Sequence, residues 1–320
     1  MARRVLRCDQ KTLQKDVSGK VYIVTGANSG VGLETTRQLV KQGGHVVMAC
    51  RRVEAGEEQA KTFDGLKGSW EVMKLDLAEL QSVRDFVKTF CDTYERLDGL
   101  VCNAGAVFTG NEAAYTIDGF EKTIGVNYLG HFLLTELLLD FLKNSASPRM
   151  VIVSSVVHAG RPTKRPKIHF DDLHYRKRAY RAFGAYAEAK LADVLYAKEL
   201  AERLKDTGVS VFSVHPGWAR SNFGRDSNLL MRVMLTIMRP LTRGLSDSCE
   251  DSAQTSLHCM LSDAALDHSG AYFSQSSVLY RDKQCKAGGW PMDSPNPNAT
   301  DMETAVELVE VSRQLVGLDG

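Results

Sequence analysis

The sequence predicts one α/β domain whose core is a doubly wound parallel sheet with helices on both faces. Short apolar runs rich in β-branched residues recur along the chain, and segments long enough for a helix separate them. The first of these runs ends in a glycine-rich turn, which is typical of a Rossmann-like sheet. The chain has 320 residues, of which 43% are hydrophobic and 25% charged, so it can bury one large core.

The first predicted unit is a strand over 20–25, the glycine-rich turn, and a helix over 31–40 that stops at Gly43-Gly44. Further predicted strands cover 45–50, 70–75, 99–102, 150–154 and 209–214. These strands are apolar on both faces, which favours a parallel sheet covered by crossover helices on each side. No repeat or linker divides the chain, so we predict a tail at 1–18 and a single domain at 19–320.

The region after Val214 is less regular and contains an apolar stretch over 229–241. Arg232 and Arg239 interrupt this stretch, which is also too short to span a bilayer. Three interpretations stay open for it: a helix packed on the core, a lid near 220–245 over an apolar substrate, and a peripheral membrane contact.

The basic N-terminal segment has no apolar run behind its charges, so the sequence indicates neither a signal peptide nor a membrane anchor. A solvated tail is the favoured interpretation, with a targeting peptide as the alternative. The seven cysteines are scattered and never form a C-x-x-C pair, which favours a reducing, cytoplasmic compartment and indicates neither disulfides nor a metal site. A formal net charge of +1 provides no basic field for nucleic acid.

The turn after the first strand reads T-G-A-N-S-G-V-G from Thr25 to Gly32. Glycines there allow a tight turn and a close approach to a diphosphate, and N–H groups at the start of the following helix face the anion. The residues of this turn predicted to contact a dinucleotide are Gly26, Asn28, Ser29, Gly30, Val31 and Gly32. A purely structural glycine turn is the alternative.

The end of the second strand is the place where an acidic residue would bind the ribose 2′-hydroxyl of NAD, but here the sequence reads A-C-R-R. Two guanidiniums without a carboxylate favour a 2′-phosphate. We therefore predict NADP(H), with Arg51 as the first choice for this contact and Arg52 as the second. An exposed arginine pair without a ligand is the alternative.

Two further strand ends are candidates for cofactor contacts. Asp76-Leu77 follows the third strand, where Asp76 either accepts a hydrogen bond from the adenine amino group or caps the helix that begins near Glu79. Asn103-Ala104-Gly105 follows the fourth strand, where small residues let the backbone pass close to the cofactor. A simple turn is the alternative there.

A tyrosine and a lysine four residues apart lie in a strongly helical segment, Y-A-E-A-K, so Tyr186 and Lys190 share one helix face. A nearby ammonium favours the phenolate and is expected to lower the tyrosine pKa toward working pH. Ser154-Ser155 ends the fifth strand, at the sheet edge where ligands collect, and two hydroxyls there can polarise a substrate carbonyl. A strand-end serine is also a common cap.

Together these motifs resemble those of short-chain dehydrogenases/reductases. T-G-A-N-S-G-V-G, D-L, N-A-G, N-Y-L-G-H, S-S, Y-A-E-A-K and H-P-G occur in the order of that family between residues 19 and 275. The resemblance implies that Tyr186 is the general acid in reduction and the base in oxidation, and that Ser155 binds the reacting oxygen. It also implies that Lys190 lowers the tyrosine pKa and holds the nicotinamide ribose, that Asn127 fixes a helix distortion and a water, and that Pro216-Gly217 lies against the nicotinamide.

Within this family, A-C-R, L-V-C-N-A-G, N-Y-L-G-H-F, V-S-S-V-V-H, F-D-D-L and V-H-P-G are similar to the retinol dehydrogenase-like group. The implied substrate is an aldehyde or ketone, or the matching alcohol. Trp218 and the apolar stretch after it favour a hydrophobic substrate, such as a retinoid or lipid aldehyde. Reduction is the expected direction with NADPH, and the resemblance allows a homodimer.

A basic segment over 161–181 lies between the serine and the tyrosine. It is either a solvated loop, the favoured interpretation, or a surface that attracts an anionic substrate or headgroup. His158 either lines the same pocket or is incidental to the loop.

Two rival functions stay open. The chain also resembles light-dependent protochlorophyllide reductase in V-V-M-A-C-R, L-V-C-N-A-G and the C-terminal L-V-E-V-S-R-Q-L-V-G-L, but Trp218 follows Gly217 where that enzyme has a cysteine. The second rival is a sensor or scaffold that binds NADPH without turnover. Such proteins commonly lack the tyrosine or the lysine that this chain retains.

Overall fold

The computed structural model describes residues 5–219, 246–277, 280 and 282–318, and these form an eight-stranded sheet in the order β3-β2-β1-β4-β5-β6-β7-β8. The strands are β1 (Val21–Thr25), β2 (His45–Cys50), β3 (Ser69–Lys74), β4 (Gly99–Cys102), β5 (Arg149–Val153), β6 (Ser210–His215), β7 (Tyr272–Ser274) and β8 (Gly289–Met292). β1 to β7 pair in parallel, and β8 pairs antiparallel with β7. The strand order reverses between β1 and β4. In doubly wound sheets, ligands commonly bind at the carboxyl ends of the strands on either side of such a point.

The predicted doubly wound sheet is confirmed, and each of the six predicted strands lies within one residue of its observed bounds. β7 and β8 were not predicted. β7 has three residues, and β8 contains Pro291, so neither carries the apolar pattern from which the other strands were recognised.

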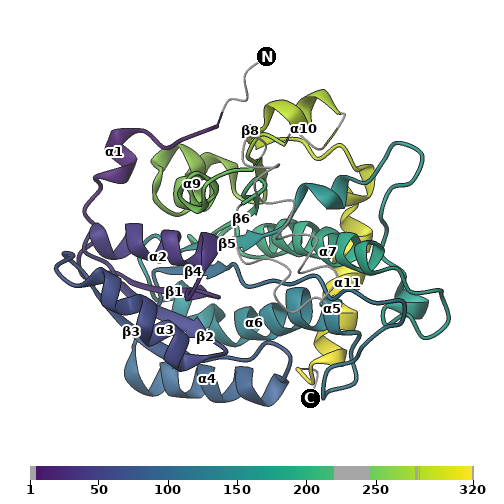
Figure 1. Cartoon of the computed structure of the whole chain (residues 1–320), viewed down its shortest axis with the longest axis horizontal. Coiled ribbons are helices and arrows are strands. Elements are labelled where there is room, and N and C mark those ends of the chain that lie inside the picture. The colour runs from purple at the N-terminus through teal and green to yellow at the C-terminus, as the bar shows by residue number, and fades with distance from the viewer. Residues whose placement is uncertain (1–4, 220–245, 278–279, 281, 319–320) are drawn as a thin grey trace.

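Helices cover both faces of the sheet, and Figure 1 shows α2 and α9 on one side with α4 and α6 on the other. The α-helices are α1 (Gln10–Leu13), α2 (Gly30–Lys41), α3 (Val53–Ala60), α4 (Leu80–Thr93), α5 (Lys122–Ile124), α6 (Gly130–Lys143), α7 (Ala182–Arg203), α9 (Cys249–Leu261), α10 (Lys283–Ala287) and α11 (Met302–Leu315). Shorter helical turns are η1 (Lys61–Phe63), the π-helical η2 (Gly125–Leu129), η3 (Val156–Ala159), η4 (Phe170–Asp172), η5 (Asp263–His268) and η6 (Pro297–Thr300).

The core has one apolar layer on each face of the sheet. One layer joins the sheet to α4, α6, α7 and α11, and the other joins it to α2 and α9. α4 shows how a helix fits this arrangement: Val83, Phe86, Val87 and Phe90 are buried and follow the spacing of one helix face. Because both faces of the sheet are covered, the carboxyl edge of the parallel strands is the place left for a ligand.

The N-terminal segment is packed against the domain, so the prediction of a solvated tail is wrong for the described residues. Leu6 exchanges two backbone hydrogen bonds with the Gln275 side chain, both of 2.7 Å. Cys8 is buried, Val17 is 1% exposed, and Arg7 forms an ion pair of 2.7 Å with Asp251 of α9. These partners lie far along the sequence, which explains why the local pattern gave no sign of them.

The predicted lid near 220–245, including the apolar stretch 229–241, lies outside the described residues. Among the helices that the structure describes, none combines the length and the apolar composition needed to cross a bilayer. All seven cysteines lie among the described residues, and none of them forms a disulfide.

Candidate active site

The glycine-rich turn connects β1 to α2 at the carboxyl edge of the sheet. Gly26 and Gly30 have φ of +65° and +62°, a left-handed conformation that glycine adopts without strain. A Cβ on Gly32 would lie 2.6 Å from the Gly26 carbonyl oxygen. The two ends of the turn pass so close to each other that position 32 requires glycine. Ser29 is the N-cap residue of α2, but its side chain forms no capping hydrogen bond. The first N–H groups of α2 are therefore available to an acceptor outside the helix, and they fit a diphosphate.

The turn Asn103-Ala104-Gly105 after β4 packs directly on the glycine-rich turn. The Asn103 side chain donates to the Thr25 carbonyl oxygen (2.8 Å), and a Cβ on Gly32 would come within 2.4 Å of the donating nitrogen. The N–H groups of Asn103 and Ala104 both donate to the Thr25 hydroxyl oxygen, each over 2.9 Å. Thr25 therefore joins two turns that the sequence predicted as separate cofactor contacts, a role that sequence reasoning missed.

A buried histidine on α6 extends this network to Asn127. His131 Nδ1 lies 3.1 Å from the Asn127 carbonyl oxygen, which can only accept, so Nδ1 carries the proton. Nε2 then accepts from the Thr25 hydroxyl over 2.9 Å. Burial lowers the pKa of His131 to about 4, which keeps the ring neutral at pH 7. His131 ends the N-Y-L-G-H motif, and its spacing of four from Asn127 was the signal that could have revealed this contact.

Asn127 lies in the π-helical turn η2, where the family resemblance implied a helix distortion. Its side-chain nitrogen donates to the carbonyl oxygens of Ala106 and Thr123, both at 2.9 Å. Its side-chain oxygen accepts from the N–H of Ala106 over 3.1 Å. A Cβ on Gly105 would lie 2.7 Å from that oxygen. The fully buried Asn127 side chain therefore ties the distorted helix to the turn after β4.

The two strand-end serines have different partners. Ser154 is buried and donates to the Lys190 carbonyl oxygen over 2.6 Å, so the prediction that both hydroxyls can polarise a substrate is wrong for Ser154. Ser155 is half-buried, and its side chain forms a hydrogen bond with Tyr186. Ser155 also caps η3, where its hydroxyl accepts from the Val157 N–H over 3.4 Å.

His158 is fully buried, which corrects both interpretations of it as a pocket-lining or incidental loop residue. Its Nδ1 donates to the Ser155 carbonyl oxygen over 2.6 Å, and its Nε2 accepts from the Ser294 hydroxyl over 2.8 Å. The ring packs edge-on against Tyr272 with centroids 4.8 Å apart. Burial lowers the pKa of His158 to about 4. This neutral histidine fixes the backbone of Ser155.

Tyr186 and Lys190 lie one turn apart on α7, and both are buried. The Lys190 ammonium is 5.8 Å from the centroid of the Tyr186 ring. It donates to the Val153 carbonyl oxygen and to the Asp193 carboxylate, each over 2.8 Å. A Cβ on Gly105 would lie 3.7 Å from the ammonium, so the lysine faces the turn after β4. Sequence reasoning missed Asp193, although an acid three residues after a helical lysine is a common ion-pair spacing.

The pKa of Tyr186 differs from the expectation. Burial, the largest effect, raises this pKa above its ordinary value, and Asp193 adds to the increase. Lys190 lowers this pKa, as predicted, and the hydrogen bond with Ser155 lowers it as well, but the two effects do not outweigh burial. Tyr186 therefore carries its proton at neutral pH, which is the state that a proton donor requires.

The two arginines predicted to select the cofactor follow β2 and are both exposed. This strand end lies beside the glycine-rich turn, because the N–H of Gly26 donates to the Ala49 carbonyl oxygen over 2.9 Å. Arg52 is the N-cap residue of α3, directly after Arg51. Lys74, the exposed last residue of β3, pairs in register with the residue before Arg51, so a third cation lies at this edge.

The end of β3 is held by its own turn. Asp76 accepts a hydrogen bond from the Ala78 N–H over 3.0 Å. Glu79 is the N-cap residue of α4, so the alternative that Asp76 caps this helix is wrong. Leu77 is buried and lies against Gly130 at the start of α6.

The loop after β6 contains the predicted nicotinamide contact, Pro216-Gly217, next to the end of β5. Gly217 has a φ of +90°, and a Cβ there would lie 2.5 Å from a carboxylate oxygen of Asp247. The same oxygen accepts from the Trp218 N–H over 3.1 Å, and the Asp247 N–H donates to the Trp218 carbonyl oxygen over 2.8 Å. Asp247 therefore fixes the backbone of this loop.

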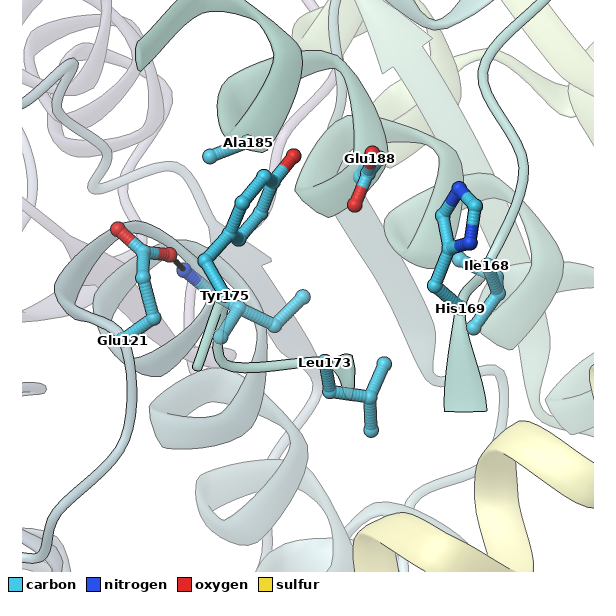
Figure 2. A pocket seen from close by; sticks show the side chains of 8 residues that line it. Glu121, Ile168, His169, Leu173, Tyr175, Ala185 and Glu188 are labelled. Atoms are coloured by element: carbon cyan, nitrogen blue, oxygen red, sulfur yellow. Dashed lines mark hydrogen bonds between the residues drawn. The ribbon is translucent and has the colours of Figure 1, made fainter. Parts of the chain in front are cut away.

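One arginine of the basic segment, Arg178, is held by carboxylates within the fold. Arg178 forms ion pairs with Asp172 (3.3 Å) and Glu188 (3.0 Å), and the Asp172 carboxylate also accepts backbone N–H groups of residues 176–178. Figure 2 shows a small pocket next to this segment, where the carboxylates of Glu121 and Glu188 are among the lining groups. Two carboxylates disfavour an anion there, so this pocket gives the anionic-ligand alternative no support.

Comparison with known proteins gives consistent relatives. A family profile described as short chain dehydrogenase matches residues 20–164. Human retinol dehydrogenase 13 is 40% identical over 95% of this chain and 86% of its own length, and human retinol dehydrogenase 12 is 42% identical over 94% and 87%. The crystal structure of an uncharacterized protein from Mycobacterium paratuberculosis has a TM-score of 0.72 at 31% identity, covering 95% of this chain and 96% of that one.

A short chain dehydrogenase from Escherichia coli CFT073, described as complexed with NADPH, has a TM-score of 0.60 at 23% identity. The match covers 82% of this chain and 98% of that chain. At 23% identity it shows a similarity of fold alone.

Proposed function

The chain belongs to the short-chain dehydrogenase/reductase family, in its retinol dehydrogenase-like group, and we propose that it uses NADP(H) to interconvert a hydrophobic carbonyl compound and its alcohol at Tyr186. Its membership makes it an oxidoreductase that acts on CH–OH groups. The proposal concerns the cofactor preference, the substrate and the roles of individual residues.

One observation carries the assignment: an unbroken chain of contacts joins the glycine-rich turn to the tyrosine. Thr25 binds the turn after β4, that turn packs on Asn127, and Gly105 faces the Lys190 ammonium. Tyr186 lies one helical turn from Lys190 and forms a hydrogen bond with Ser155. A diphosphate on the first turn of α2 thus has the catalytic groups at the same edge of the sheet.

In the proposed reduction, bound NADPH supplies a hydride to the carbonyl carbon. The Ser155 hydroxyl donates a hydrogen bond to the carbonyl oxygen and orients it. The Tyr186 hydroxyl transfers its proton to that oxygen as negative charge develops there, which gives the alcohol and a phenolate. Lys190 stabilises the phenolate by its positive charge, and solvent returns the proton. Oxidation reverses these steps, with the phenolate as the base.

The preference for NADP(H) is proposed from the charges at the ends of β2 and β3. Three cations lie where the adenosine ribose is expected: Arg51, Arg52 and Lys74. The end of β2 has no carboxylate that could bind a 2′-hydroxyl. Guanidinium groups bind phosphate through charge-assisted hydrogen bonds.

A hydrophobic substrate is proposed because Trp218 follows the nicotinamide contact and because the relatives named above are retinol dehydrogenases. Retinal-like and lipid aldehydes are the first compounds to test. Ketones with an apolar body come second.

The test is a screen of NADPH consumption with all-trans-retinal, steroid ketones, medium-chain aldehydes and quinones. We expect turnover with at least one apolar aldehyde or ketone, and a loss of about 10²- to 10⁴-fold in the Tyr186→Phe variant, which retains the ring but has no transferable proton. Turnover that requires light and a pigment substrate would favour the protochlorophyllide reductase alternative. NADPH binding without turnover on any compound would favour the sensor or scaffold.

A further inference from the structure

Asp193 is a buried acid in direct contact with the lysine of the active site. It lies on α7, three residues after Lys190, and its carboxylate accepts a hydrogen bond from the ammonium over 2.8 Å. The exposed fractions of the two side chains are 4% for Lys190 and 2% for Asp193. A charge pair this deep is not a solvent-exposed helix pair, since water does not screen it.

The position of the lysine is fixed by two acceptors from different elements. The ammonium has three N–H groups, of which one donates to Val153 of β5 and one to Asp193. One N–H group is left for an outside acceptor, and under the proposed function this acceptor is a hydroxyl of the nicotinamide ribose. Removing one of the two fixed contacts frees the ammonium to change its direction.

The other titratable groups that face the Lys190–Asp193 pair are uncharged at neutral pH. Tyr186 approaches from α7, Cys102 from β4, Tyr128 from η2 and His131 from α6. Burial raises the pKa of Cys102 to about 12 and that of Tyr128 further, and it lowers that of His131 to about 4. The electrostatic field at the Tyr186 hydroxyl is therefore set mainly by the ammonium and the carboxylate.

We propose that Asp193 is a positioning residue that orients the Lys190 ammonium and, by partly cancelling its charge, sets the pH range in which Tyr186 exchanges its proton. The proposal rests on the function proposed above. It assigns to Asp193 an effect on cofactor binding, through the position of the ammonium, and an effect on the proton step, through its charge.

The direction of the second effect follows from the charges. Burial, then Asp193, raise the pKa of Tyr186, whereas Lys190 lowers it. An amide at position 193 removes the opposing negative charge but still accepts a hydrogen bond from the ammonium. The pKa of Tyr186 must then fall, and we expect a decrease of about one unit, the lower end of what a nearby charge produces. Oxidation needs the phenolate, so its pH–rate profile shifts to lower pH. Reduction needs the protonated tyrosine, so its rate begins to fall at a lower pH than in the natural chain.

The experiment measures the near-ultraviolet absorbance of tyrosinate during an alkaline titration, without substrate. The difference between each protein and its Tyr186→Phe counterpart isolates Tyr186 from the other tyrosines. We expect a lower midpoint in Asp193→Asn than in the natural chain, and an NADPH Kd that rises by about fivefold, as for one weakened hydrogen bond. Where the amide is not tolerated by the fold, Asp193→Ser is the second neutral variant and predicts the same shift.

The matched control is Asp92→Asn, which removes the acid from an exposed ion pair of 2.8 Å with Lys88 on α4. This variant should leave both the midpoint and the Kd unchanged. An unchanged Tyr186 midpoint in a folded Asp193→Asn or Asp193→Ser protein overturns the proposal. If no protein oxidises NADPH, the proposed function fails, but the absorbance titration still reports on Asp193, so the two failures are distinguishable.

Discussion

Ser154 and Ser155 illustrate how the site depends on single residues. The Ser154 hydroxyl donates a hydrogen bond to the Lys190 carbonyl oxygen. The Ser155 side chain instead forms a hydrogen bond with Tyr186, and its backbone carbonyl oxygen accepts one from His158. One serine therefore holds helix α7 to the end of strand β5, and its neighbour is the one that we propose to bind the substrate oxygen. A sequence of two identical residues cannot separate these roles, because they depend on partners from distant parts of the chain.

At the same scale, Arg51 tests the cofactor preference. Replacing Arg51 by Gln removes a cation but keeps a polar side chain of similar length. We expect the kcat/KM for NADPH to fall by about tenfold or more, as for the loss of a charge-assisted hydrogen bond, with little change for NADH. Arg52→Gln serves as the comparison and should have the smaller effect. Equal kcat/KM values for the two cofactors in the natural chain would contradict the assignment of NADP(H).

Among the elements, the turn between β1 and α2 is the one proposed to contact the cofactor diphosphate. Its geometry depends on contacts with the turn after β4, where Asn103 and Ala104 bind Thr25. Two strand ends that are far apart in sequence thus form one rigid edge. The first turn of α2 lies at that edge and has no side-chain cap, so its N–H groups are available to a ligand.

Gly32→Ala tests this packing. A Cβ at position 32 would lie 2.4 Å from the Asn103 side-chain nitrogen and 2.6 Å from the Gly26 carbonyl oxygen. Separating these groups is expected to cost about 1–3 kcal/mol of stability and to weaken NADPH binding, measured by urea unfolding and by fluorescence titration. Gly110→Ala is the control, because its Cβ would approach no atom closer than 3.5 Å. Unaltered cofactor affinity in Gly32→Ala would show that the turn is not part of the binding site.

The elements were largely predictable from the sequence, and the contacts between them were not. Strands β1 to β6 have a strong apolar pattern, so their bounds follow from local residues. The same reasoning missed β7 and β8, which are short, and the packed segment before β1. In the candidate site it identified Tyr186 and Lys190 by their spacing, but the net direction of the tyrosine pKa depends on burial, which spacing does not reveal.

For the whole molecule, buried neutral histidines make the stability depend on pH. Burial lowers the pKa of His131 and His158 to about 4 in the folded chain, against about 6.5 when unfolded. Between these two pKa values the unfolded chain binds more protons than the folded chain. The contribution of the neutral histidines to the free energy of unfolding is therefore complete above pH 6.5 and is lost as the pH falls toward 4. Each histidine is expected to lower the free energy of unfolding by about 2 kcal/mol between pH 7 and pH 5.

Urea unfolding of His158→Gln at the two pH values measures this effect. Glutamine has no proton to gain, so the variant should lose less stability on acidification than the natural chain, even where it is less stable at pH 7. His268→Gln, at an exposed position in η5, should keep the natural pH dependence. The explanation is wrong if His158→Gln shows the same acid loss as the natural chain.

The central claim for the molecule is that a protonated Tyr186, held beside Lys190 and Ser155, delivers the proton that accompanies hydride transfer. The most direct measurement compares the kcat/KM for the best carbonyl substrate and the NADPH Kd in the natural chain and in Tyr186→Phe. We predict a kcat/KM at least about 10²-fold lower with a Kd that is nearly unchanged. A Tyr186→Phe variant that turns over at the natural rate would contradict the claim.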